Sequence, residues 1–219
     1  MNLLIIGAPG VGKGTMSRFL VAHHKLVHVS TGDMLRQAIA DQTPVGMLAK
    51  THMDKGELVP DEVIHSIIVE RLKQDDIKRG FLFDGYPRTV NQAIDLDKIL
   101  SELNMKIDAV LNLQIDDEVV VKRITGRRTC NKCGTIYNIY FDPPKVEGIC
   151  NNCGDTLQMR SDDNPESLKI RLSEFHKNTQ PVIEYYEKQN LVYGINADQD
   201  RESEFVDIQK ILEGLKWFR

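Results

Sequence analysis

Nine residues near the start of the chain have the composition and spacing of a loop that binds phosphate. The segment GAPGVGKGT (7–15) contains four glycines, one lysine and one threonine. Glycines allow a loop to turn its backbone N–H groups inward around an anion, because no side chain blocks the close approach. The spacing Gly7-x4-Gly12-Lys13 matches the phosphate-loop pattern, and it places Lys13 as an exposed loop cation able to reach the outer phosphates of a triphosphate. A plain strand–turn–helix junction, the alternative, would need only one or two glycines.

The second candidate is a carboxylate at the end of the apolar segment FLFD (81–84). A strand that ends in Asp84 is the expected partner of a phosphate loop, because a carboxylate there can orient water around a Mg²⁺ that bridges phosphates. Arg88 follows four residues later, on the same side of the predicted sheet. The alternative is that Asp84 only caps a turn, which is a common role for aspartate.

Arginines form a third pattern, because they recur near predicted strand ends, helix starts and the cysteine segment. Arginine suits bidentate binding of phosphate, and two phosphorylated substrates that meet head to head need several cations. A chain with a formal net charge of −4 would have to concentrate these cations in one cleft. Some of them are expected to be ordinary surface residues. The group comprises Arg36, Arg88, Arg123, Arg127, Arg128, Arg160 and Arg171.

The four cysteines form two C-x2-C pairs separated by sixteen residues, each followed by glycine. This is the spacing of a four-thiolate zinc site, in which no position stays open for water, so the metal would be structural. Iron could take the same ligands, and two disulfides are the alternative. A metal would help this segment to order, because it is too short to bury a good core. The predicted ligands are Cys130, Cys133, Cys150 and Cys153.

Composition limits the class of protein. The 219 residues are 41% hydrophobic and 27% charged, as in an ordinary globular chain. The acidic balance argues against nucleic acid and anionic membrane as partners. The apolar runs are too short to span a bilayer, and no basic stretch precedes the first of them, so we expect a cytoplasmic protein.

Strands and helices alternate along the chain, which predicts an α/β fold with a five-stranded parallel sheet covered by helices on both faces. Ligands in such sheets lie beyond the carboxyl ends of the strands, where both the glycine loop and Asp84 are placed. The expected strands are 2–6, 27–30, 81–84, 108–115 and 191–195. The expected helices begin near residues 13, 33, 44, 60, 88, 116 and 201. A further, long helix is expected to begin at residue 164 and to contain Pro181.

Seven motifs in order together resemble the adenylate kinase family, in the bacterial form whose long lid carries zinc. They are GAPGVGKGT, STGDMLR (30–36), LVPDE (58–62), DGYPRT (84–89), ITGRR (124–128), YFDPPKVEG (140–148) and RSDDN (160–164). The resemblance implies a P-loop nucleoside monophosphate kinase fold with a zinc-binding lid insert. It also implies phosphoryl transfer from Mg·ATP to AMP giving two ADP, Mg²⁺ with ATP, structural Zn²⁺, and a monomer.

The resemblance also implies domains and residue roles. The core would comprise 1–29, 60–126 and 164–219, the AMP-binding domain 30–59 and the lid 127–163. ATP would contact Gly10, Val11, Gly12, Lys13, Gly14, Thr15, Arg123, Arg127, Tyr137 and Gln199. AMP would contact Thr31, Arg36, Glu57, Leu58, Val59, Gly85, Arg88, Gln92, Arg160 and Arg171. The catalytic groups would be Lys13, Asp84, Arg88, Arg127, Arg160 and Arg171, and Asp162 and Asp163 would pair with the arginines of the lid.

Three departures from the family pattern leave the donor base open, namely Tyr86, Asn138 and Ala197. The transfer needs no general base, because the nucleophile is an anionic phosphate oxygen. We therefore interpret all six histidines as helix-surface or packing residues. Two alternatives remain: a kinase for another monophosphate or a small metabolite, and a zinc-ribbon interaction module joined to a nucleotide switch.

Overall fold

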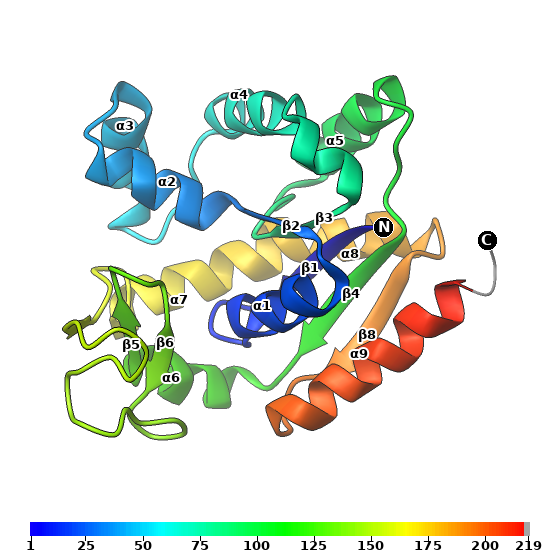
Figure 1. Cartoon of the computed structure of the whole chain (residues 1–219). Coiled ribbons are helices and arrows are strands. Elements are labelled where there is room, and N and C mark those ends of the chain that lie inside the picture. The colour runs from blue at the N-terminus through cyan, green and yellow to red at the C-terminus, as the bar shows by residue number, and fades with distance from the viewer. Residues whose placement is uncertain (217–219) are drawn as a thin grey trace.

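The computed structural model describes residues 1–216, and its centre is a five-stranded parallel sheet in the order β2-β3-β1-β4-β8 (Figure 1). Each predicted strand is present to within two residues at either end. The strands are β1 (Asn2–Gly7), β2 (Val27–Ser30), β3 (Phe81–Asp84), β4 (Ala109–Gln114) and β8 (Val192–Asn196). Their carboxyl ends share one edge, since Ser30 pairs with Asp84 and Ile5 pairs with Asp84 in a parallel register.

Helices cover both faces of this sheet, as predicted. Alternate residues of β1 point to opposite faces, so Leu3 and Ile5 join one core cluster while Leu4 and Ile6 join the other. The first cluster packs under α1 (Lys13–His24) and α9 (Arg201–Lys216). The second packs under α4 (Asp61–Leu72), α5 (Val90–Glu102) and α8 (Gln180–Glu187). Further helices before the second sheet are α2 (Thr31–Ala40), α3 (Pro44–Met53), α6 (Asp117–Thr125) and the 3₁₀ segment η1 (Asp75–Arg79).

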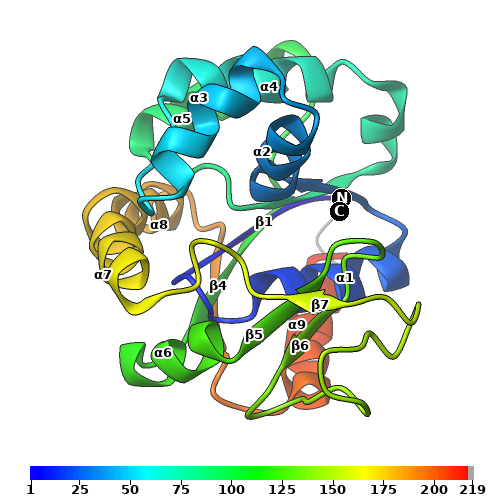
Figure 2. The ribbon, with the colours of Figure 1, turned by 90° about the vertical axis from the view of Figure 1, so that its left-hand side faces the viewer.

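A second, antiparallel sheet of three strands lies between α6 and the next helix in the sequence. Its strands are β5 (Arg127–Cys130), β6 (Ile136–Asn138) and β7 (Leu157–Gln158), in the order β6-β5-β7. We call residues 127–163 the cysteine segment. Figure 2 shows its three strands below the central sheet, with α3 and α4 above that sheet.

The long helix predicted from residue 164 is present, and a π-helical turn interrupts its α-helical hydrogen bonding. The path comprises α7 (Pro165–Glu174), the π-helical turn η2 (Phe175–Thr179) and α8. Pro181 lies in the first turn of α8, where its missing N–H costs no helical hydrogen bond. In the wider π turn, the Gln180 N–H donates to the Phe175 carbonyl oxygen. The helix therefore continues through the turn and accommodates Pro181.

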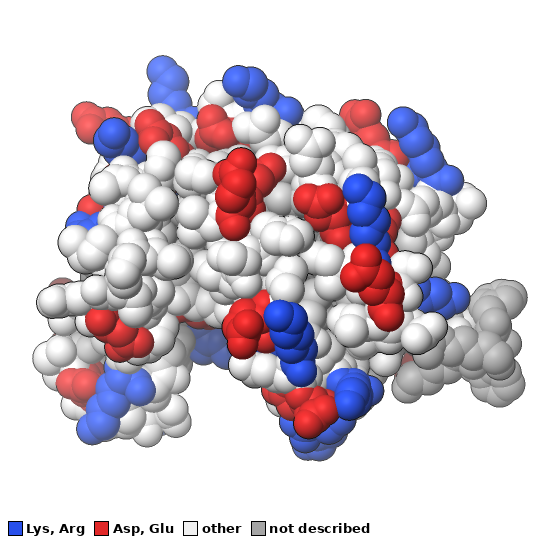
Figure 3. All heavy atoms as spheres, turned by 90° about the horizontal axis from the view of Figure 1, so that it is seen from above, with Lys and Arg blue, Asp and Glu red and all other residues white. Residues whose placement is uncertain are grey.

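No helix within residues 1–216 combines the length and the apolar character that crossing a membrane requires. The face above α3, α4 and α5 carries positive and negative side chains that intermingle, without a large patch of one sign (Figure 3).

Candidate active site

The glycine loop follows β1 at the carboxyl edge of the central sheet and leads directly into α1. Gly12 caps the helix with a φ of 119°, and Gly10 has a φ of 82°. A Cβ added at Gly10 would lie 2.7 Å from the Ile124 side chain, so both dihedral and space require glycine there. The loop therefore presents backbone N–H groups and a helix N-terminus toward the space beyond the sheet, which favours an anion.

Lys13 is not the exposed loop cation that the sequence predicted. It is the first residue of α1, and its Nζ donates to the carbonyl oxygens of Gly7 at 2.7 Å and Ala8 at 2.9 Å. Burial lowers the pKa of Lys13 to about 7, although the charge of Asp84 opposes this shift. A cation held in such a desolvated position is stabilised by a nearby anion, so the lysine and the loop favour the same kind of ligand.

Asp84 ends β3 next to the glycine loop, as predicted. Its Oδ2 lies 3.6 Å from the position of a Cβ built on Gly14 and 3.7 Å from the Nε2 atom of His28. Asp84 and Thr15 both line the large cleft, and a carboxylate and a hydroxyl are oxygen donors of the kind that Mg²⁺ prefers, so this set of donors fits the predicted ion. His28 lies on strand β2 and lines the cleft, so the interpretation of all six histidines as helix-surface or packing residues was too broad.

One cleft of about 1270 Å³ brings the predicted cations together. Burial lowers the pKa of Arg160 to about 9, and the neighbouring Arg127 and Arg36 lower it further. Burial likewise lowers the pKa of Arg88 and Arg171, with other arginines contributing. Such crowding of like charges favours a polyanionic ligand. The cations that line the cleft include Lys13, Arg36, Arg88, Arg123, Arg127, Arg160 and Arg171.

Arg128 is the exception in the predicted group of arginines. Its Nη1 donates to the carbonyl oxygens of Thr125 and Arg127, and it is absent from the cleft wall. Arg128 follows Arg127 along strand β5, where successive side chains point to opposite faces. Only Arg127 therefore faces the cleft.

Two adjacent acidic residues hold the arginines of the cysteine segment and α7, as predicted. Arg127 makes a bidentate ion pair with the fully buried carboxylate of Asp163. Arg171 pairs with Asp162 at 2.9 Å and with Asp163 at 3.6 Å. Paired arginines keep their charge and a fixed direction, which orients their remaining donors.

A smaller pocket of about 80 Å³ adjoins the cleft and shares wall residues with it, among them Arg36, Gly85, Arg88 and Arg171. Of the ten residues predicted to contact AMP, nine line this pocket, and Arg160 lines the larger cleft instead. The nine are Thr31, Arg36, Glu57, Leu58, Val59, Gly85, Arg88, Gln92 and Arg171.

Gln92 is fixed in this pocket by partners that sequence reasoning missed. Its Oε1 accepts from the Arg88 backbone N–H at 2.7 Å, and its Nε2 donates to Asp61 at 2.6 Å. Asp61 also accepts from the Thr89 hydroxyl at 3.0 Å. The sequence offered only a weak indication of this role, because acidic residues such as Asp61 are common in the first turn of a helix.

The other end of the large cleft is built around Arg123 on α6. Its two terminal nitrogens donate to the carbonyl oxygens of Val11 at 2.7 Å and Ala197 at 3.0 Å. The guanidinium plane is therefore fixed between the glycine loop and the loop before α9. Val11 itself is fully buried in the core and is the only predicted ATP contact absent from the cleft wall.

Tyr137 and Gln199 line the cleft, but the Tyr137 hydroxyl and the Gln199 Nε2 atom already have partners. The Tyr137 hydroxyl accepts from the Asn151 backbone N–H at 2.8 Å and lies 3.5 Å from the Cys150 sulfur. Gln199 Nε2 donates to the Asn196 carbonyl oxygen and to Asp207. For Tyr137, the ring is what remains for contact with a ligand.

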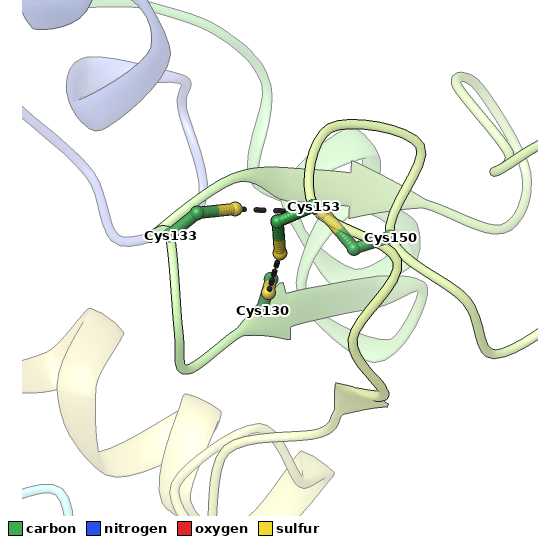
Figure 4. Close-up of side chains that lie close together, drawn as sticks. All are labelled: Cys130, Cys133, Cys150 and Cys153. Atoms are coloured by element: carbon green, nitrogen blue, oxygen red, sulfur yellow. Dashed lines mark hydrogen bonds between the residues drawn. The ribbon is translucent and has the colours of Figure 1, made fainter.

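The four cysteines converge at the tip of the small sheet (Figure 4). Their Sγ atoms all lie within 4.8 Å of one another. The closest approaches are 3.4 Å between Cys130 and Cys153 and 3.5 Å between Cys133 and Cys150. A disulfide requires about 2.05 Å, so the disulfide alternative is wrong for this structure and all four thiols are unpaired.

The local backbone explains this convergence. Gly134 and Gly154 have φ values of 71° and 74°, and their N–H groups donate to the carbonyl oxygens of Cys130 and Cys150. Each C-x2-C pair thus forms a tight turn that directs both sulfurs to one point. Four sulfurs at these separations fit tetrahedral zinc, with Zn–S bonds near 2.3 Å.

These features define an α/β phosphotransferase with a P-loop nucleoside monophosphate kinase fold and a four-cysteine insert that fits a zinc lid. The chain belongs to the adenylate kinase family, whose profile matches residues 5–191. It is 49% identical to the adenylate kinase of Geobacillus sp. (strain WCH70), across 99% of this chain and 100% of that protein. It is 47% identical to that of Bacillus subtilis (strain 168), with the same coverage. It is 50% identical to that of Desulforamulus reducens, across 95% of this chain and 98% of that protein.

Proposed function

We propose that the chain transfers the terminal phosphoryl group of Mg·ATP to AMP, reversibly, giving two ADP. The observation that carries this proposal is the pair of adjoining pockets. One begins at the glycine loop, the other is lined by Thr31 and Gln92, and Arg36, Arg88 and Arg171 lie on the wall of both. Such an arrangement suits two phosphorylated ligands that meet head to head.

The donor occupies the large cleft in this proposal. The glycine loop and Lys13 bind the ATP phosphates, Arg123 stacks on the base, and Arg127 reaches the phosphates. Bound Mg²⁺ would neutralise charge on the bridging phosphate oxygens, and Asp84 and Thr15 are the residues placed to hold it or its water. The support is that these side chains line one cleft at the carboxyl edge of the sheet. Gly10, Val11, Gly12, Gly14, Tyr137 and Gln199 complete the proposed donor set.

The acceptor occupies the small pocket. Thr31, Arg36 and the backbone around Glu57 and Val59 bind AMP, and Arg88 contacts its phosphate. Gln92 contacts the adenine, and Leu58 and Gly85 complete the walls of the pocket. Arg160 and Arg171 close over the transferred group from the side of the large cleft. The reaction then depends on alignment and on charge stabilisation by these cations rather than on proton transfer.

We also propose that residues 30–59 and 127–163 act as an AMP-binding domain and a lid on the core formed by 1–29, 60–126 and 164–219. Closure of the lid would exclude water, which otherwise competes as phosphate acceptor. Zinc at the cysteines would make the lid a rigid body. The unpaired thiols support a cytoplasmic location, and we expect a monomer, which sedimentation would test.

The test of the proposed function is acceptor specificity. With Mg·ATP as donor, we expect AMP to exceed UMP, CMP and GMP in kcat/KM by at least about a hundredfold, since a fixed hydrogen-bonding side chain rejects a base that leaves it unpaired. A coupled assay that varies the four monophosphates measures this. Comparable efficiency with UMP or CMP would instead support a kinase for another monophosphate.

Asp61 should act on the acceptor alone. We expect Asp61→Ala to raise KM for AMP roughly tenfold, because Gln92 loses the partner that fixes its amide. KM for ATP should stay within about twofold. The matched control is Glu62→Ala, at the exposed neighbouring position of the same helix turn. An equal rise in both KM values would mean that Asp61 supports the fold rather than the acceptor pocket.

A further inference from the structure

Helix α9 places an acidic residue where its pattern calls for an apolar one. Glu204, Ile208 and Leu212 follow at intervals of four, so they lie on one face of the helix. Ile208 and Leu212 are fully buried in the core cluster under the sheet. Glu204 is only 5% exposed, although glutamate is almost never buried without a partner.

The Glu204 carboxyl has no such partner among residues 1–216. Its Oε1 is buried and makes no hydrogen bond, and no cation there lies within 4.0 Å of the carboxyl. Arg123 is the charged group that acts on it, but the terminal nitrogens of Arg123 donate to backbone carbonyl oxygens. Burial raises the pKa of Glu204 to about 7, against the opposing charge of Arg123. The neutral acid is therefore well populated near neutral pH.

Glu204 also lines the large cleft, together with Arg123 and Gln199. This is the end at which the proposed function places the donor base. The carboxyl lies at the wall of this cleft without a hydrogen-bond partner of its own, and a turn of the side chain would bring its buried Oε1 to a ligand there. An unpartnered buried polar group costs stability in the free protein, and a ligand in the adjoining cleft can supply the missing partner.

The chemistry of the group selects among the bases. A neutral carboxyl offers one donor and one acceptor side by side, as does the edge of adenine that bears N1 and the 6-amino group. Resting on the proposed function, we propose that Glu204 is a specificity-determining residue for the donor nucleotide, whose carboxyl accepts from the adenine 6-amino group and donates to the adjacent ring nitrogen.

The experiment pairs a change in the protein with a change in the ligand. The ligands are ATP and purine riboside triphosphate, which lacks the 6-amino group, each with AMP as acceptor. The variants are Glu204→Leu, which removes the carboxyl and suits the apolar stripe, and Glu204→Gln, which keeps one donor and one acceptor. Glu213→Gln is the control, because Glu213 is an exposed glutamate of the same helix.

The readout is the ratio of kcat/KM for ATP to that for the analogue. We expect Glu204→Leu to lower this ratio about tenfold relative to the parent protein, and the Gln variant and the control to keep it within about threefold. KM for AMP should not change. An unchanged ratio in Glu204→Leu overturns the proposal and leaves Glu204 as a buried structural acid, whatever the melting temperatures of the variants.

A direct binding measurement separates this inference from the proposed function. If the parent protein transfers no phosphoryl group from ATP to AMP, the proposed function fails, but equilibrium dialysis of the two triphosphates still measures the preference for the 6-amino group. A preference that Glu204→Leu reduces supports the assignment of Glu204 even then. Equal affinities for the two triphosphates in the parent protein overturn it.

Discussion

Lys13→Met should lower kcat by roughly a hundredfold to a thousandfold while the protein stays folded. This is the loss expected when one preorganised charge is removed from a developing phosphoryl charge. Lys13 supplies its charge from a desolvated position at the start of α1, where its interaction with phosphate is stronger than it would be in water. Methionine has a similar length and no charge, so the site keeps its shape. Steady-state kinetics with Mg·ATP and AMP measures the loss.

The control for this prediction is Lys169→Met, at an exposed position of α7. It makes the same chemical change away from the cleft, and it should leave kcat within about twofold. Circular dichroism and thermal unfolding should show both variants folded. Near-normal turnover by a folded Lys13→Met protein would refute the assignment of residues 7–15 as the phosphate loop.

Cys130→Ser should lower the melting temperature by roughly 10 °C, which corresponds to about 3–4 kcal/mol for a chain of this size. The physical reason is the small core of the cysteine segment. Its buried cluster consists of Cys130, Tyr137 and Cys150, with Cys153 and Leu157 packed against it. A metal bound by the four thiolates would therefore supply most of what holds the four-cysteine tip together. Turnover measured well below the melting temperature should largely survive, because the arginines of the cleft lie outside the metal shell.

Elemental analysis of the parent protein should find about one zinc, or iron, per chain, since four thiolates complete one tetrahedron. Lys132→Ser is the matched control, because Lys132 lies between two ligands of one turn and is exposed; it should keep both the metal and the melting temperature. Normal thermal stability with lost turnover in Cys130→Ser would show that the metal serves the chemistry rather than the fold.

The local sequence was sufficient to predict the five strands of the central sheet, the main helices and the glycine after each cysteine pair, but not the three strands of the cysteine segment. Each of the predicted features depends on short-range patterns: apolar runs ended by glycine or aspartate, and glycines at positions with positive φ such as Gly134 and Gly154. The five-stranded parallel sheet followed from the alternation of these elements. The residues proposed to contact the nucleotides were assigned from the family resemblance and not from periodicity. The roles of these residues stay predictions.

What the sequence by itself determined is therefore the set of elements, the glycine loop at the end of the first strand and the four-cysteine tip. Only the tertiary structure decided the environments. These are the half-buried, desolvated position of Lys13, the hydrogen bond from Gln92 to Asp61, and the unpartnered carboxyl of Glu204 at the cleft. The physical reason is that the two kinds of interaction act over different distances along the chain. Dihedral preferences and hydrophobic periodicity act within a few residues, whereas desolvation and hydrogen-bond partnership depend on atoms that folding brings together from distant parts of the chain.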